Sequence, residues 1–148
     1  PFGAFISIID PALIQSGLQE KWLNEALKPG SGHSWLRLDG RRPLLIHTDP
    51  LNDNDEIEGF VVSTGEIVQH RLTPPELHSI DQVASAASRN DIGKITLRCS
   101  LDPELQPTIQ RRLDKALRDV DGSKSFMVDI DLERGTGSHK LYIICKEN

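Results

Sequence analysis

Residues 93–147 have the sequence GKITLRCSLDPELQPTIQRRLDKALRDVDGSKSFMVDIDLERGTGSHKLYIICKE. Apolar and polar residues alternate over 94–101 and again over 125–133, which is typical of strands with one buried face. Between these runs, apolar residues recur every three or four positions across 105–117, as on the buried side of a helix. A last apolar run covers 140–145. This stretch therefore predicts the order strand, helix, strand, strand.

The remainder of the chain carries the same kinds of signal. Upstream we expect a strand over 2–9 and a helix from Asp10 to about Lys28. Two hairpins should follow: strands 34–38 and 43–48 around a turn at 39–40, and strands 59–63 and 66–72 around a turn at 64–65, with an acidic loop over 49–58 between the hairpins. A helix capped by Thr73 should then run to 90–93. Gly17 weakens the first helix by about 1 kcal/mol relative to Ala, so a break or kink would fall there.

The elements together predict an α+β fold. We expect an antiparallel or mixed sheet of about seven strands with three helices on one face, in the order β-α-β-β, β-β-α, β-α-β-β. A chain of 148 residues fits one domain, residues 1–148. Asp10-Pro11 and Asp102-Pro103 open the first and last helices alike, which suggests a duplication of units 2–48 and 93–147. Asp-Pro helix starts also arise by chance, and both explanations stay open at this point.

The apolar faces of these elements predict the core. The expected core residues are Phe5, Leu18, Trp22, Leu27, Leu77, Ile80, Leu97, Ile109, Leu113, Phe126, Val128, Ile130 and Ile143.

Charge and cysteine content restrict the class of function. The net charge is −5, and residues 1–92 carry 7 Lys/Arg against 13 Asp/Glu. Such an acidic segment disfavours broad binding to nucleic-acid phosphates. The balanced last third leaves nucleic-acid binding through Arg111 and Arg118 of the last helix as an alternative. Cys99 and Cys145 occupy apolar strand positions, which favours buried thiols in a reducing compartment over a disulfide.

No apolar run is long enough to span a membrane. The N-terminus has no cationic region of the kind that begins a signal peptide. We therefore expect a soluble, intracellular and cytoplasmic protein.

Two groups of acidic residues are candidate metal sites. Asp129, Asp131 and Glu133 share one strand face, where paired carboxylates could hold Mg²⁺, although a solvated polar face has the same pattern. The loop Asp49–Glu58 is rich in oxygen ligands, but Ile57 stands where a calcium loop needs Gly. We expect no cofactor.

Acid–base chemistry has two candidate sources. His47 and His70 lie on neighbouring predicted hairpins and could meet across a sheet. Pro1 would be a secondary amine that can act as a base or nucleophile near neutral pH. A proline ahead of the first strand, together with a second β-α-β unit, resembles the tautomerase superfamily. The resemblance implies a catalytic Pro1, but the chain departs from that family in its long middle insert of strands and helix.

The apolar pattern of the last strand favours a protein-binding function over a catalytic one. Tyr142 and Ile144 are apolar on the face opposite Leu141 and Ile143, so the strand is either central or docked on a partner. Each motif with catalytic spacing is explained as well by an ordinary structural role. We therefore expect a non-catalytic protein–protein interaction, regulatory or assembly domain that binds a protein partner or self-associates into an oligomer through Tyr142, Ile144, Arg111 and Arg118. A tautomerase-like enzyme and a nucleic-acid binder remain the alternatives.

Overall fold

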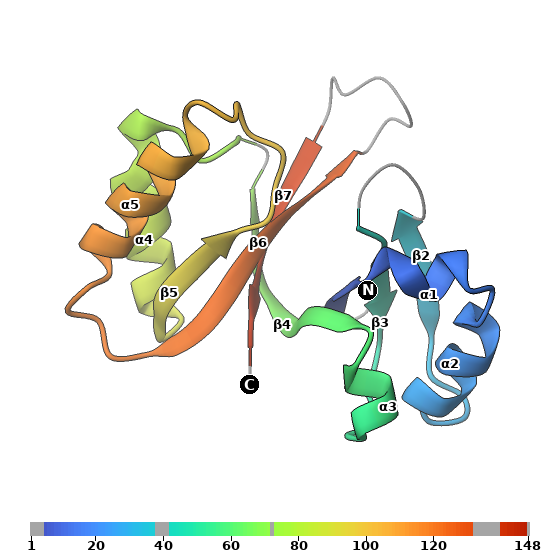
Figure 1. The fold of residues 1–148 in the computed structure, drawn as a ribbon. Coiled ribbons are helices and arrows are strands. Elements are labelled where there is room, and N and C mark those ends of the chain that lie inside the picture. Colours follow the sequence, from blue (N-terminus) through green and yellow to red (C-terminus); the bar gives the residue numbers. More distant parts are fainter. Residues whose placement is uncertain (1–4, 38–41, 72, 132–139, 148) are drawn as a thin grey trace. The chain divides into compact units, whose positions relative to one another are not determined.

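A computed structural model describes residues 5–37, 42–71, 73–131 and 140–147. The chain divides into two compact units, Pro1–Glu66 and Ile67–Asn148 (Figure 1). Strand β4 begins in the first unit and ends in the second.

The first unit places helices against antiparallel strands. Its elements are β1 (Phe5–Ile9), α1 (Pro11–Gln15), α2 (Gln19–Ala26), β2 (His33–Arg37), β3 (Leu44–His47), α3 (Asp55–Glu58) and the first part of β4 (Val61–Arg71). Its strand order is β2-β3-β1-β4, with β1 antiparallel to both neighbours. The buried core of this unit consists of Ile9, Leu13, Trp22, Leu23, Ala26, Leu27, Leu45 and Ile57.

The first predicted helix divides into α1 and α2 at the glycine that the sequence singled out. Gly17 has a φ of 74°, in the left-handed region that favours glycine. Asp10 caps α1 as expected, because its side chain accepts a hydrogen bond from the backbone N–H of Ala12 at 2.9 Å. The break changes the orientation of Leu18, which is 48% exposed rather than buried in the core.

The predicted hairpin at 64–65 is wrong, because β4 runs without interruption through both residues. Thr64 and Gly65 pair with Ser7 and Ile6 of β1, and Gly65 is buried. The φ of Gly65 is not positive, whereas tight hairpin turns require positive φ values. The neighbouring strand β1 therefore keeps this stretch extended.

The second unit contains the stretch 93–147 and follows the predicted order. Its elements are the second part of β4, the 3-10 turn η1 (Leu77–Ser79), α4 (Ile80–Arg89), β5 (Ile92–Leu97), α5 (Gln106–Ala116), β6 (Ser123–Asp131) and β7 (Lys140–Lys146). Its strand order is β4-β7-β6-β5. The pair β5–β6 is parallel, with α5 as the crossover, and the pair β6–β7 is antiparallel.

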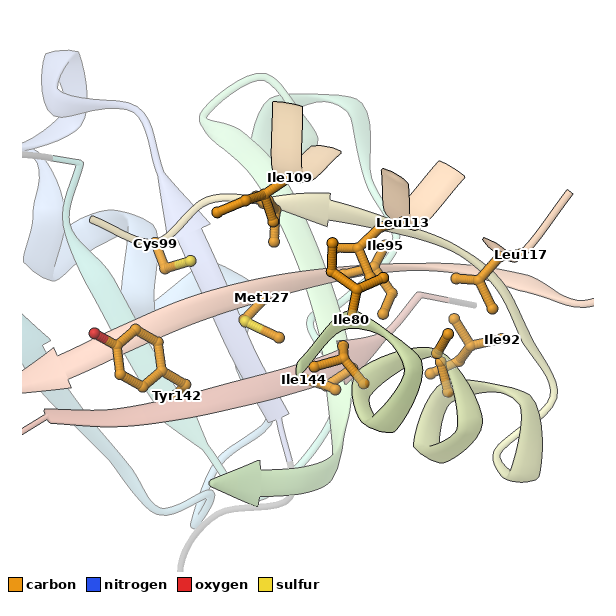
Figure 2. Close-up of a cluster of buried hydrophobic side chains, with 14 residues drawn as sticks. Ile80, Ile92, Ile95, Cys99, Ile109, Leu113, Leu117, Met127, Tyr142 and Ile144 are labelled. Atoms are coloured by element: carbon orange, nitrogen blue, oxygen red, sulfur yellow. The ribbon is translucent and has the colours of Figure 1, made fainter. Parts of the chain in front are cut away.

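Helices α4 and α5 cover one face of these strands. Figure 2 shows Ile109 of α5 near Met127 of β6, Leu113 of α5 beside Ile95 of β5, and Leu117, the residue that follows α5, beside Ile92. Ile80, the first residue of α4, belongs to the same cluster. Tyr142 and Ile144 of β7 belong to the same buried cluster. Both helices therefore contribute their apolar stripes to one core, as their periodicity predicted.

The opposite face of β6 and β7 is buried as well. Phe126, Val128, Ile143 and Cys145 are each at most 4% exposed. Central strands that are buried on both faces carry nearly continuous apolar runs. The doubly apolar pattern of the last strand therefore corresponds to burial of both of its faces.

Three local predictions need correction. Leu77 is 38% exposed, because the helix cap is Glu76 with Ser79 rather than Thr73, and Leu77 lies in the turn before α4. The last helix begins at Gln106, after a turn in which Asp102 accepts from Glu104 N–H. The acidic loop contains the short helix α3, which Asn54 caps.

The α+β class and the mixed seven-stranded arrangement are confirmed. The described residues contain five α-helices rather than three, because the first helix breaks and α3 forms in the acidic loop. The segments 2–48 and 93–147 differ in strand order. In the first segment β3 lies between β1 and β2, whereas in the second β6 lies between β5 and β7. The predicted duplication thus has no counterpart in the strand order.

Candidate functional site

Strand β2 is terminal in the strand order, so one of its edges pairs with no strand of the described chain. The backbone N–H of Thr48 donates to Gly32 C=O at 3.0 Å, which shows that Gly32 faces β3. In an antiparallel pair, successive residues direct their backbone groups to alternate sides. Ser34 therefore also faces β3, whereas His33 and Trp35 direct their N–H and C=O groups toward the open edge.

The accessible part of this edge is its beginning. The side chains of His33 and Ser34 are exposed, and they project to opposite faces of the strand. Trp35 packs partly against the core of the first unit and so fixes the strand in place. The pairing with β3 shifts register between Trp35 and Arg37, and such a bulge twists an edge away from further pairing. The regular open edge is thus His33–Trp35.

The outer edge of β5, the terminal strand of the second unit, is blocked by side chains of α5. The side-chain Oε1 of Gln110 accepts from the backbone N–H of Leu97 at 2.9 Å, and its Nε2 donates to Ile95 C=O at 2.7 Å. Gln106 Nε2 donates to Leu97 C=O at 3.4 Å. The Gln110 amide therefore makes the donor and acceptor bonds that a neighbouring strand would otherwise make.

Replacing Gln110 by Leu should open the β5 edge. The variant loses both bonds to Ile95 and Leu97, so their backbone groups become available to another chain. We expect concentration-dependent association in light scattering and a loss of stability of about 1 kcal/mol. The control Arg111→Leu adds the same apolar side chain to an exposed position of α5 without touching β5. Equal association of the two variants would show that added apolar surface, and not the edge, is responsible.

His47 is buried in a chain of polar side chains within the first unit. Its Nδ1 lies 2.7 Å from the backbone oxygen of Asp49, which can only accept, so Nδ1 carries the proton. Its Nε2 then accepts from the hydroxyl of Ser7 at 2.7 Å. The Ser7 oxygen accepts in turn from Thr64 Oγ1 at 2.7 Å. These hydrogen bonds thus fix one tautomer of the His47 ring.

The surroundings of His47 favour its neutral form. Burial is the largest cause that lowers the pKa of His47, and His33, its cross-strand partner on β2, lowers it further. The hydrogen bond to the Asp49 carbonyl acts in the opposite direction. The ring also stacks on Phe5 with a centroid distance of 5.7 Å. Ser7 and His47 have the spacing of an acid–base pair, but both are at most 1% exposed, so substrate cannot reach them.

The three residues predicted for acid–base chemistry lie in different settings. The hydrogen bonds of His47 go to Ser7 and Asp49 rather than to His70. His70 is exposed on the part of β4 that belongs to the second unit. The cross-strand histidine partner of His47 is His33. Pro1 lies outside the described residues.

The two carboxylates predicted as metal ligands differ in burial. Asp129 is fully buried, accepts from Ser100 N–H at 2.9 Å and pairs with Lys140 Nζ at 3.5 Å. Asp131 is half-buried opposite Lys140 in the β6–β7 register, and Glu133 is outside the described residues. In the described ranges no group of three His, Cys, Asp or Glu side chains could hold a metal ion. Burial, followed by the charge of Asp129, raises the pKa of Tyr142.

The residues predicted to bind a partner separate into buried and exposed pairs. Tyr142 and Ile144 are 6% and 2% exposed in the core of their own unit, so they present no surface to a partner. Arg111 and Arg118 are exposed on α5, and Arg111 donates to Thr108 at 3.3 Å. Next to them on α5, Asp114 contacts Lys94 at 3.3 Å and Gln110 at 3.1 Å.

Cys99 and Cys145 are both buried thiols, as their apolar strand positions predicted. The alternative of a disulfide between them is therefore wrong. Burial raises the pKa of the Cys145 thiol, which keeps it protonated and unreactive at neutral pH.

Comparison of the chain with protein-family models, with curated proteins and with solved structures finds no match in any of the three. Among the described residues, no helix is both long and apolar enough to cross a membrane.

Proposed function

We propose that this chain is a non-catalytic protein-interaction module in which β2 accepts an extended segment of a partner protein. The observation that carries the proposal is the contrast between the two terminal strands. Gln110 and Gln106 occupy the outer backbone groups of β5, whereas no described residue does so for His33 and Trp35 of β2. Proteins commonly block exposed strand edges, and an edge left open is suited to strand addition.

The local structure of β2 supports this role. Its inner side pairs with β3, and Trp35 contacts the core, so the edge is already formed before a partner arrives. A preformed edge lowers the entropy cost of binding, since only the incoming segment has to become ordered. Two outward residues supply donors and acceptors for main-chain hydrogen bonds, each worth about 0.5–1.5 kcal/mol net. This arrangement supports a short, sequence-tolerant contact.

The enzyme alternative lacks comparable support. Ser7 and His47, the pair with acid–base distances, are buried within the strands of the first unit. Their hydrogen bonds satisfy one another and the Asp49 carbonyl. A buried and satisfied polar chain of this kind specifies the packing of β1 against β3.

The proposal is tested with His33→Pro. Proline removes the outward N–H of residue 33, and its ring obstructs the edge, but the bonds of Gly32 and Ser34 to β3 remain. Peptides selected on the wild-type chain from a random-peptide display library should bind His33→Pro about tenfold more weakly in fluorescence anisotropy. Circular dichroism establishes that the variant is folded.

The matched control is His33→Ala, which removes the same side chain and keeps the N–H. It should bind the selected peptides as the wild type does. Equal affinity of the peptides for wild type and His33→Pro would overturn the proposal.

A further inference from the structure

We infer that Thr73 is a phosphorylation site and that Arg71 is the cation that pairs with the phosphate. Thr73 is exposed in a bend between the end of β4 and η1. Arg71, the last residue of β4, directs its guanidinium at the Thr73 hydroxyl: Nε donates to Oγ1 at 3.3 Å, and Nη2 donates to it at 2.9 Å. Both residues belong to the second unit, so the inference is independent of the β2 edge.

The guanidinium of Arg71 has a neutral acceptor where a charged one would suit it better. Within the described chain its hydrogen bonds go to the hydroxyl of Thr73, and it forms no ion pair with a described carboxylate. Burial is the largest cause that lowers the pKa of Arg71, and the charge of Glu76 acts in the opposite direction. Nε and Nη2 form one edge of the guanidinium, which can bind two oxygens of a phosphate side by side.

The sequence around Thr73 fits the demands of a protein kinase. Thr73-Pro74 is the one place in the 148 residues where a serine or threonine precedes a proline. The residue before a proline is biased toward an extended backbone. Proline also has no N–H, so a kinase site that offers no hydrogen-bond acceptor at this position favours proline over every other residue. Pro75, the next residue, is buried and anchors the segment.

The reaction requires ATP, Mg²⁺ and a Ser/Thr protein kinase. The Thr73 oxygen attacks the γ-phosphorus of ATP, and the bond from that phosphorus to the β-phosphate oxygen breaks. ADP leaves, and the hydroxyl proton passes to the catalytic base of the kinase. The in-line geometry of this step requires an accessible acceptor hydroxyl, and the exposure of Thr73 provides it.

Phosphorylation would replace a neutral hydrogen bond by a charged one at the point where β4 ends. A phosphothreonine carries a charge of about −1.5 to −2 at pH 7 and offers three strong acceptor oxygens. Glu76 opposes the added charge, although its carboxylate already lies 3.0 Å from the imidazole of His78. The phosphate therefore pairs with Arg71 and holds the bend that leads into η1.

The first experiment tests the site on the folded chain. The protein is incubated with Mg²⁺, ATP and a purified proline-directed Ser/Thr kinase, and the position of the phosphate is determined by tandem mass spectrometry. We expect phosphate on Thr73. Thr73→Ser should keep the site, whereas Pro74→Ala should slow its labelling about tenfold, because it restores an N–H that the kinase leaves unpaired. If the kinase labels a reference substrate in the same tube but not Thr73, the inference is overturned.

The second experiment tests the role of Arg71 in the phosphorylated chain. The second pKa of a phosphothreonine is about 6, and a nearby cation lowers it by favouring the dianion. Titration followed by ³¹P NMR should therefore give a pKa about 0.5 lower in the wild type than in Arg71→Gln. Arg89→Gln, the same change of charge at the other end of α4, should match the wild type. Equal values in the wild type and Arg71→Gln would overturn the assignment of Arg71 as the partner of the phosphate.

Discussion

Replacing Leu113 by Ala should lower the free energy of unfolding by about 2–5 kcal/mol. Leu113 is 0% exposed in the middle of α5 and belongs to the core between that helix and the strands of the second unit (Figure 2). Truncation removes buried apolar surface and leaves a cavity that the regular strands β5 and β6 cannot readily close. Urea unfolding followed by circular dichroism at the helix band measures the change, because α4 and α5 are two of the longest helices.

Leu18→Ala is the matched control for this prediction. Leu18 is 48% exposed at the start of α2, so the same truncation should change stability by less than about 0.5 kcal/mol. The sequence pattern placed both leucines in the core. A loss at Leu18 equal to that at Leu113 would mean that the pattern was right and the break at Gly17 is not formed.

The two leucines show what periodicity can and cannot determine. The apolar stripe of α5 continues without glycine through Ile109 and Leu113, so its buried face was predicted correctly. In the first helix, Gly17 adopts a positive φ and the helix restarts with a different phase. The position of a break follows from one residue, but the direction of the chain after the break depends on packing against the rest of the unit.

Strand β4 shows a second limit of predicting structure from local sequence. Thr64-Gly65 between two apolar runs is a typical hairpin signal. The structure keeps both residues extended because β1 pairs with them, and that partner lies more than fifty residues earlier in the chain. Local turn propensity is small compared with a full ladder of cross-strand contacts, so the distant partner prevails.

The candidate edge could be predicted only in part. The sequence placed β2 and β3 as a hairpin, but which strand is terminal depends on the order of all the strands. Gln110 stands on the polar face of the last helix, where a glutamine usually faces solvent. Gln106 and Gln110 stand four residues apart, a spacing that places both amides on one side of a helix. That spacing was the available signal, and it acquires meaning only when the helix lies beside a strand edge.

Asp129 and Asp131 differ in burial, which their spacing along the strand does not predict. Alternation correctly placed Asp129 and Asp131 on one side of β6. Their different burial arises because Asp129 reaches the Ser100 N–H and Lys140, contacts that join residues about thirty and eleven positions away. Sequence spacing within one strand contains no information about such partners.

Replacing Gly122 by Ala should destabilise the second unit by about 3 kcal/mol or more, because the added carbon meets backbone and not a movable side chain. A Cβ at this position would lie 2.4 Å from the backbone oxygen of Asp91 and 2.8 Å from the nitrogen of Gly93. Asp91 C=O also accepts from Ser123 N–H at 2.8 Å, so relieving the clash would break the bond with which β6 begins.

The control Gly59→Ala has no contact closer than 3.5 Å and a φ of −59°, and it should leave stability unchanged or raise it by about 0.4–1 kcal/mol. Thermal unfolding of both variants measures the difference. A Gly122→Ala variant as stable as wild type would show that the close approach of the segments before β5 and β6 is not formed, and with it the register that places Ile95 and Leu97 beside Gln110.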